Sequence, residues 1–340
     1  MLKSRRFWIG LGITLLFLFL FLYRTDFAEM GRALGQANYL FLLPGLLFYL
    51  VGVLFRSLRW RYLLKPIGTF SPLRLFPLIV IGFLVNNVLP ARLGIVARAY
   101  ILGEREGVSK MATAGTIVVE QVFDGVTLLL LAAIISLFGV AVGGVMQNTV
   151  YVVAGFLLGA LVLCLVLVSS QRLARRAIAL LLRVLPQRWR GRAGEWLALL
   201  IEGLGIMRSP GKLFVVLIIS MLVWLSEASV FYMVGFSFGL ELPFHVFLLA
   251  ASLSNLAWAL LMTPGGLGPF DYFCQQTLIY FGVAEAVATS YVVALHAVIL
   301  LPMIALGFVF LWWENLSLAK IVPRGEQRPA PAHDPKEAEE

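Results

Sequence analysis

Charged residues and cysteines are both scarce in this sequence. Only 13% of the 340 residues are Asp, Glu, Lys or Arg, and 61% are apolar, whereas a soluble domain has about 25% charged and about 45–50% apolar residues. A soluble fold could not bury this much apolar surface, so the composition predicts an all-α polytopic integral membrane protein. The two cysteines, Cys164 and Cys274, lie in apolar runs and indicate neither a disulfide framework nor a metal site.

Motifs of soluble enzyme chemistry are also missing. The sequence contains no Walker loop, no HExxH and no cluster of metal ligands. Residues 235–239, GFSFG, fit the pattern G-x-S-x-G, but they close an apolar span and have no His–Asp set nearby, so helix packing explains them better. We therefore expect no catalytic residues, no cofactor, no metal and no nucleic-acid partner.

Positive charge is absent from two long stretches, although the net charge is +9. No Lys or Arg occurs between Lys110 and Arg172, or between Lys212 and Lys320. Loops rich in Lys and Arg stay in the cytoplasm. We therefore expect a multi-pass protein of the cell inner (cytoplasmic) membrane, with both its N- and C-termini in the cytoplasm.

Six apolar runs are long enough for full crossings, because about 20 helical residues span the hydrocarbon core. Two further segments differ: 75–90 ends in "NNVLPARLG", and 246–282 is split by "TPGGLGPFD". A full crossing at 75–90 would place the Arg and Lys residues that follow it outside the cell, against the charge rule. We therefore expect a re-entrant hairpin at 75–90 and a second one at the broken segment 246–282. The six expected crossings are roughly 7–23, 39–58, 111–138, 149–168, 213–238 and 287–313.

The two interrupted segments resemble each other. "LPARLG" at 89–94 and "TPGGLG" at 263–268 share a proline followed by Leu-Gly at the same spacing. An odd number of expected crossings separates them, so two hairpins would enter from opposite faces. That is the pattern of an inverted repeat with a substrate site near the midplane. The expected repeat halves are about 39–138 and 213–313; the alternative is that Gly and Pro merely kink tightly packed spans.

The remaining segments predict lipid contact rather than further domains. Residues 171–211 form a basic amphipathic connector that is expected to lie on anionic lipid; the alternative is a solvated loop helix with snorkelling arginines. Residues 1–320 are expected to form a single transmembrane domain, and the proline- and charge-rich segment 321–340 a disordered cytoplasmic tail. The small-residue pair in "GFLLG" (155–159) permits a homodimer.

Several ionisable residues lie at membrane depth in the expected crossings. Glu120 and Asp124 are four residues apart and therefore share a helix face. Glu227 lies at a similar depth, Asp271 follows the glycine turn, and His296 is in the last crossing. Charges at such depth mark a pathway or a charge pair; a purely structural ion pair is the alternative, and for His296 alone simple packing is the plainer explanation. The expected partners are Arg56, Arg59, Arg92 and Arg98.

The two proline–glycine breaks together predict an anion site. Gly265, Gly266 and Gly268 let the chain turn and let a ligand approach closely, and the free N–H groups of the helix that follows would attract a phosphate or carboxylate. Arg92, at the equivalent place of the first break, could add a bidentate contact. The expected substrate-binding residues are Arg56, Arg59, Arg92, Arg98, Asn86, Asn87, Glu120, Asp124, Gly265, Gly266, Gly268 and Asp271.

Four motifs resemble, in order, the flippase-like transmembrane domain of lysylphosphatidylglycerol synthases. They are "RSLRWRYLL" (56–64), "NNVLPARLGIVARAYIL" (86–102), "VVEQVFDGVTLLLL" (118–131) and "TPGGLGPFD" (263–271). The resemblance implies a domain that moves aminoacylated phospholipid between leaflets. The synthase reaction belongs to a separate soluble domain and is not implied, so we expect no enzyme.

Three positions depart from the family's usual pattern. Ile95 stands where the family usually has a Glu, Gln121 where it usually has an Arg, and Asp271 where a Glu is common. Ile95 and Gln121 alter the charge pairing that is usual in the family, and they are compatible with a lipid headgroup different from the family's usual one. We therefore expect a lipid translocase for a phospholipid, aminoacylated or otherwise modified. The alternatives are a carrier of polyprenyl-phosphate or a polyprenyl-linked glycan, and a membrane scaffold subunit that transports nothing.

Overall fold

The computed structural model describes residues 5–23, 25–88, 93–137, 210–261, 263–314 and 316. Within these ranges all regular structure is helical, which confirms the all-α fold class. The expected crossing at 149–168, nearly all of the connector 171–211, the tail 321–340 and Arg92 lie outside the described residues. The helices are α1 (Arg5–Leu22), α2 (Phe27–Gln36), η1 (Tyr39–Phe41), α3 (Leu42–Leu63), α4 (Pro72–Val88), α5 (Gly94–Glu106), α6 (Lys110–Leu137), α10 (Pro210–Ser237), α11 (Phe244–Leu261), η3 (Pro264–Gly266), α12 (Pro269–Tyr280) and α13 (Glu285–Trp313).

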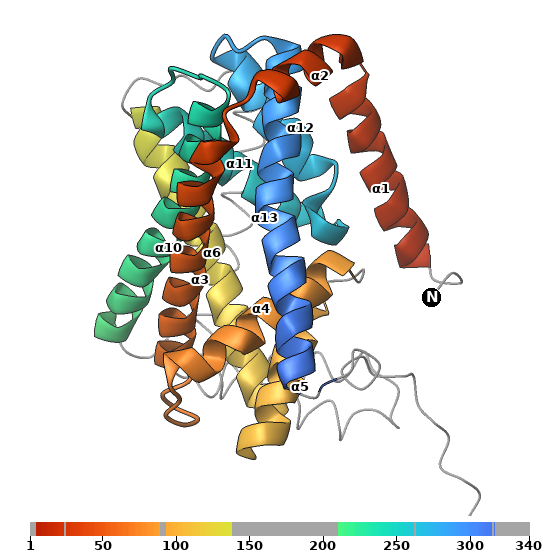
Figure 1. Ribbon diagram of the computed structural model, residues 1–340. Coiled ribbons are helices and arrows are strands. Elements are labelled where there is room, and N and C mark those ends of the chain that lie inside the picture. Colours follow the sequence, from red (N-terminus) through yellow and green to blue (C-terminus); the bar gives the residue numbers. More distant parts are fainter. Residues whose placement is uncertain are drawn as a thin grey trace, which may run out of the picture.

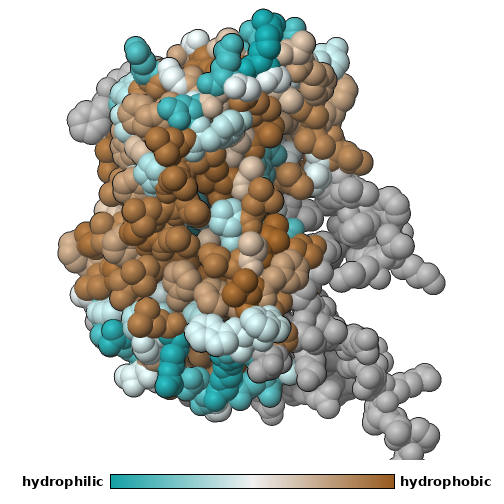
Figure 2. Space-filling model, in the orientation of Figure 1, coloured by the Kyte–Doolittle hydropathy of each residue, from teal (hydrophilic) through white to brown (hydrophobic). Residues whose placement is uncertain are grey.

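An apolar band crosses the face of the molecule seen in Figure 2. Hydrophobic residues form a broad band at mid-height in this view, and hydrophilic residues gather at both ends. Large apolar side chains such as Leu43, Leu47 and Leu301 are exposed. In the part of the chain that the structure describes, five helical segments are long and apolar enough to cross a membrane, and the protein is therefore a multi-pass membrane protein. They are Tyr39–Leu63, Lys110–Ile135, Gly211–Ser237, Phe244–Leu261 and Glu285–Trp313.

The two interrupted segments differ in how far their first helices reach. Phe244–Leu261 is long enough to cross a membrane, although the sequence placed it in the re-entrant segment 246–282. Pro72–Val88, in the other interrupted segment, is apolar but shorter. The number of full crossings and the inverted repeat therefore remain predictions.

Each interrupted segment folds into two helices that pack against each other. α5 approaches α4 closely at Gly94, where an added Cβ would lie 2.3 Å from the backbone oxygen of Gly82. α11 and α12 also pack together and are joined through η3. In Figure 1, α4 and α5 lie toward the lower end of the molecule, and α11 and α12 toward the upper end. Because η3 contacts α4, the second break meets the first hairpin inside the bundle.

The long helices α3, α6, α10 and α13 frame these hairpins. α3 and α10 are antiparallel neighbours. The N–H of Asn38, just before η1 and α3, donates to the carbonyl of Ser237, the last residue of α10, at 2.8 Å. α6 packs against α3, α10 and α11, whereas α13 packs against α2, α4 and α12. The frame therefore brings helices from both halves of the sequence around one central space.

Candidate functional site

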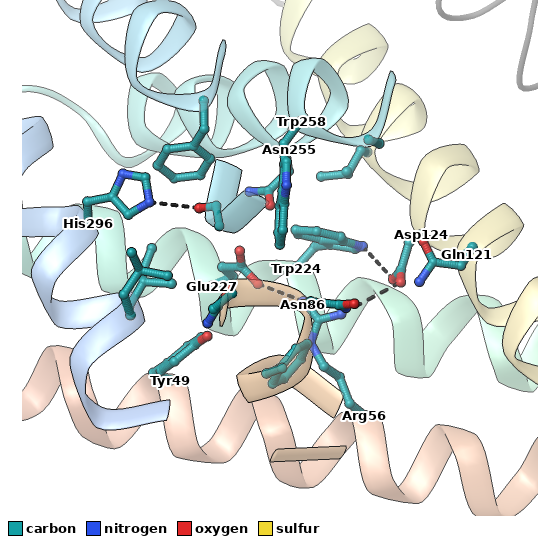
Figure 3. A pocket seen from close by; sticks show the side chains of 18 of the residues that line it. Tyr49, Arg56, Asn86, Gln121, Asp124, Trp224, Glu227, Asn255, Trp258 and His296 are labelled. Carbon is teal, nitrogen blue, oxygen red and sulfur yellow. Dashed lines mark hydrogen bonds and ion pairs between the residues drawn. The ribbon is translucent and has the colours of Figure 1, made fainter. Parts of the chain in front are cut away.

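A cavity of about 130 Å³ lies where the hairpins meet the frame (Figure 3). Side chains from α3, α4, α6, α10, α11 and α13 reach its wall, together with the glycine turn. Aromatic rings and polar groups alternate there, which is typical of a ligand site whose few polar groups fix orientation. The polar lining residues are Tyr49, Arg56, Asn86, Asn87, Gln121, Asp124, Glu227, Asn255 and His296, and the aromatic ones include Phe83, Trp224, Trp258 and Phe270.

Arg56 carries positive charge to the cavity wall. Its Nη2 donates to Oε2 of Glu227 at 2.7 Å, and its Nη1 lies 3.6 Å from Oδ2 of Asp124. The guanidinium carbon is 5.0 Å from the ring centre of Trp224 and 5.6 Å from that of Phe83. Arg56 is therefore held by two carboxylates and by two rings whose faces attract a cation.

Two further arginines extend this network behind the wall. Arg59, whose side chain is fully buried, donates to both carboxylate oxygens of Asp124 at 2.6 and 3.1 Å and to Glu120 at 3.1 Å. Arg98 donates to the other oxygen of Glu120 at 2.8 Å and lies 4.1 Å from the ring centre of Trp60. Glu120 is thus shared between α3 and α5, and it ties the first hairpin to the frame.

Opposite charges balance in this buried network. Each arginine has a carboxylate partner within 3.1 Å. Pairing of this kind offsets the desolvation of the ions, which costs several kcal/mol for each isolated charge. Any charged ligand in this cavity would therefore have to replace one of these partners or bring its own counter-charge. The members are Arg56, Arg59 and Arg98 on one side and Glu120, Asp124 and Glu227 on the other.

Helical spacing explains why these residues meet. Arg56 and Arg59 are three apart on α3, and Glu120 and Asp124 are four apart on α6, so each pair shares a face. Since α3 packs against α6 and α10, the arginine face meets the carboxylates of both neighbours. The arginine partners expected for Glu120 and Asp124 are thus present.

The glycine turn forms another part of the wall. Gly265, Gly266 and Gly268 have φ of 60°, 81° and 90°, a region in which a side chain would be strained. Of the three, Gly265 lines the cavity. Gly266 packs against the ring of Trp258, and Gly268 packs against α1, where an added Cβ would lie 2.9 Å from a backbone oxygen. The turn therefore presents one glycine to the cavity and uses the others for packing.

Asp271 and His296 fasten this turn. Oδ2 of Asp271 accepts from the N–H of Gly268 at 2.8 Å and caps the start of α12. The ring of His296 lies between two oxygens, with Nδ1 2.5 Å from Oδ1 of Asp271 and Nε2 2.9 Å from the carbonyl of Gly265. The sequence predicted an arginine as partner of Asp271, but among the described residues the partner is His296. The reason is that α12 folds back against α13, whereas the described arginines of the network lie on α3 and α5.

A comparison with known families covers most of the chain. The model for the lysylphosphatidylglycerol synthase transmembrane region matches residues 7–307. The chain belongs to this family. The match confirms the resemblance found in the four motifs, and it includes all the elements that line the cavity.

Two relatives are similar to this chain over different shares of their own length. A UPF0104 membrane protein of Methanothermobacter thermautotrophicus is 27% identical over 299 residues, which are 82% of this chain and 85% of the relative. The glycosyltransferase AglD of Haloferax volcanii is 30% identical over 146 residues, which are 43% of this chain and only 23% of that protein. The first relative is thus similar over most of its length, and the second over less than a quarter.

The expected substrate-binding residues of this family member fall into three groups. Arg56, Asn86, Asn87, Asp124 and Gly265 line the cavity. Arg59, Arg98 and Glu120 lie behind it in the charge network, and Gly266, Gly268 and Asp271 belong to the turn. Arg92 lies outside the described residues, and substrate binding by any of them remains a prediction.

Several cavity residues had not been identified as site residues from the sequence. Tyr49, Trp224, Trp258 and Phe270 are aromatic residues in apolar runs, where a ring facing lipid and a ring facing a cavity look alike. Asn255 does carry a signal, because a primary amide inside an 18-residue apolar helix is costly unless it has a polar environment.

Proposed function

We propose that this protein is a lipid translocase that moves a phospholipid, or a phospholipid with a modified headgroup, between the leaflets of its membrane. The observation that carries the proposal is the polar, charge-lined cavity whose wall is formed largely by long apolar helices. Polar and charged groups at membrane depth are costly and usually mark a substrate path. Membership of the lysylphosphatidylglycerol synthase transmembrane family supports a role with lipid.

In this proposal Arg56 contacts the lipid phosphate. It lines the cavity together with its partner Glu227, so a phosphate can take the place of the carboxylate. That exchange keeps the guanidinium paired and avoids most of the cost of breaking a buried ion pair, about 3–5 kcal/mol. The released Glu227 and the nearby Asp124 would accept an ammonium or hydroxyl group of the headgroup.

The other expected residues support this contact. Asn86 and Asn87 line the cavity with amide side chains. Oδ1 of Asn86 accepts from the N–H of Gly94 at 2.8 Å. Arg59, Arg98 and Glu120 would position the network without touching the lipid. Arg92 remains the proposed second phosphate ligand. Gln121, which lines the cavity where the family usually has an arginine, would leave this cavity with fewer cations for anionic headgroups.

Charge at the two ends of the molecule supports the expected orientation. The ends of α3 and α5 and the start of α6 lie toward the lower end in Figure 1. Among the described residues there, Arg61, Lys65, Arg105 and Lys110 outnumber the acidic Glu104 and Glu106. Acidic residues dominate at the upper end, around α2 and the starts of α11 and α13; they include Asp26, Glu29, Glu241 and Glu285. By the positive-inside rule, we assign the lower end to the cytoplasm.

Reconstitution in vesicles that carry a fluorescent phospholipid tests the proposal. Dye-labelled lipid that starts in the inner leaflet should move to the outer leaflet, and be quenched there by an impermeant quencher, quickly in protein-containing vesicles and slowly in empty ones. The paired variant Arg56→Gln with Glu227→Gln removes both charges and keeps the network neutral, and it should slow the movement at least about tenfold, equivalent to about 1.4 kcal/mol. Its matched control is Arg74→Gln with Glu106→Gln, a pair 3.9 Å apart with Arg74 77% exposed. Equal rates for wild type, the paired variant and empty vesicles would contradict the proposal.

A second candidate is a carrier for polyprenyl-phosphate or a polyprenyl-linked glycan. The similarity to a protein named as a glycosyltransferase favours it, and a phosphate on Arg56 would serve it equally. The same vesicles with a fluorescent polyprenyl-phosphate decide between the two, since movement of this probe alone would favour the second candidate. If neither probe moves, the protein would be assigned to the third alternative, a membrane scaffold subunit that transports nothing.

A further inference from the structure

His296 joins the two ends of the glycine turn to α13. Its Nε2 lies 2.9 Å from the carbonyl oxygen of Gly265 and its Nδ1 2.5 Å from Oδ1 of Asp271. The second oxygen of Asp271 is occupied by the N–H of Gly268 at 2.8 Å. Both residues of the pair are buried, and His296 and Gly265 also reach the cavity. One imidazole thus connects the cavity wall with the cap of α12.

This geometry determines how many protons the pair holds. A carbonyl oxygen can only accept, so Nε2 must carry a hydrogen to bond Gly265. Nδ1 then faces a carboxyl oxygen, and a bond between them needs a proton on one of the two. The pair is either an imidazolium with a carboxylate or an imidazole with a carboxylic acid. Both forms hold one proton more than a neutral imidazole beside a carboxylate.

Loss of that proton breaks one of the two bonds. A neutral imidazole has a single N–H; if that hydrogen stays on Nδ1 to bond Asp271, the lone pair of Nε2 faces the carbonyl of Gly265. The turn is then released from α13. An added Cβ on Gly265 would lie 3.8 Å from the backbone oxygen of Asn87, so the released turn borders α4 as well as the cavity.

The other charged groups that line the cavity are already neutralised by partners. Arg56, Asp124 and Glu227, which line the same cavity, belong to the balanced network, so a proton on the pair changes the cavity's charge by one unit. Tyr291 on α13 donates its hydroxyl to the carbonyl of Phe231. The remaining titratable or charged groups on the elements packed against α13 are Tyr49, Arg59, Arg61 and Tyr62 on α3, Arg74 on α4, Glu29 and Arg32 on α2, Lys212 and Tyr232 on α10, and Tyr272, Cys274 and Tyr280 on α12.

We propose that His296 and Asp271 form a proton-binding site that clamps the glycine turn to α13 when loaded and frees it when empty, so that lipid movement is coupled to proton movement. The inference rests on the proposed function for its coupling step, but not for the proton site itself. The proton enters from water on one side of the membrane through the cavity, and it leaves to water on the other side when the turn moves. No other covalent bond forms or breaks.

Ring-nitrogen NMR of the purified protein in lipid nanodiscs, labelled with ¹⁵N-histidine, tests the proton site directly. The chain has three histidines, and His296→Gln identifies the signal. In wild type, Nε2 should carry hydrogen at low and neutral pH and lose it to the Nδ1–H form as the pH rises. In Asp271→Asn, the amide can donate to Nδ1 without an extra proton, so the Nε2–H form should persist at every pH. A wild-type signal that shows the neutral Nδ1–H form throughout, or no change with pH, would overturn the site.

Vesicles with a pH gradient test the coupling. For one proton per lipid, a gradient of one pH unit should support a dye asymmetry of up to about tenfold. Both His296→Gln and Asp271→Asn should abolish this asymmetry, whereas Glu285→Gln, in the first turn of α13, should retain it. Lipid movement that ignores the gradient in wild type would overturn the coupling and leave the proposed function standing. Absence of any lipid movement in wild type would overturn both the coupling and the proposed function. The NMR titration would still decide whether His296 and Asp271 form a proton site.

Discussion

Removing Arg59 should destabilise the fold through the charges that it leaves behind. Its side chain is fully buried and donates to Asp124 at 2.6 and 3.1 Å and to Glu120 at 3.1 Å. Arg59→Gln would leave the network with one uncompensated negative charge. Loss of one partner of a buried pair costs about 3–5 kcal/mol, and we expect the lower part of this range because Glu120 keeps Arg98 and Asp124 keeps the N–H of Trp224 at 3.1 Å.

The charge interpretation is tested by a double-mutant cycle. Asp124→Asn should also destabilise the protein, but combined with Arg59→Gln it restores neutrality, so the double variant should be more stable than the sum of the single effects by about 2 kcal/mol or more. The free energy of unfolding can be measured by reversible denaturant titration in mixed micelles. The exposed pair Arg74 and Glu106 provides the control cycle, with an expected coupling of about 0–1 kcal/mol. Additive single effects for Arg59 and Asp124 would refute the reasoning.

Three further predictions follow from single positions. Gly94→Ala should lower the free energy of unfolding by about 1–3 kcal/mol, because the added Cβ would clash with α4. The control Gly31→Ala has nothing near its added Cβ and should be neutral or stabilising. Equal losses of unfolding free energy in the two variants would contradict the packing argument. The pKa of Asp26 lies below its usual value because backbone N–H groups of α2 donate to its carboxylate. The stability that this cap adds to α2 is therefore fully present above the usual pKa and is lost as the pH falls through the lowered pKa. The hydrogen-exchange rates of α2 amides in wild type and in Asp26→Ala should differ at neutral pH and converge at low pH, and a difference that stays constant with pH would contradict the role of the cap. Maleimide should label Lys65→Cys only from the cytoplasm and Glu241→Cys only from outside, and labelling of both from one side would overturn the orientation.

Composition and charge spacing were enough to predict a large part of this molecule. The helical membrane fold follows from apolar runs that no soluble protein could bury. The meeting of the arginines on α3 with Glu120 and Asp124 follows from spacings of three and four residues, since a helix at membrane depth must turn its charged face toward a partner. The importance of the "TPGGLGPFD" break follows from residues that a helix interior disfavours.

The remaining features depend on how distant segments fold back. His296 and Asp271 are 25 positions apart, and only the return of α12 along α13 shows that they are partners. Gly268 faces α1 rather than the cavity for the same kind of reason. The aromatic lining was unpredictable because hydrophobic periodicity records burial and does not distinguish a packed face from a cavity wall.

The equal numbers of arginines and carboxylates in the network of Arg56, Arg59, Arg98, Glu120, Asp124 and Glu227 have an electrical consequence. A membrane potential acts on net charge, at about 2.3 kcal/mol per elementary charge for each 100 mV, and a cluster that sums to zero feels no net force when it moves as a unit. Voltage sensitivity in this protein would then report the cargo and the charge on the His296–Asp271 pair. Current recordings would therefore reveal these two charges without a contribution from the arginine–carboxylate network.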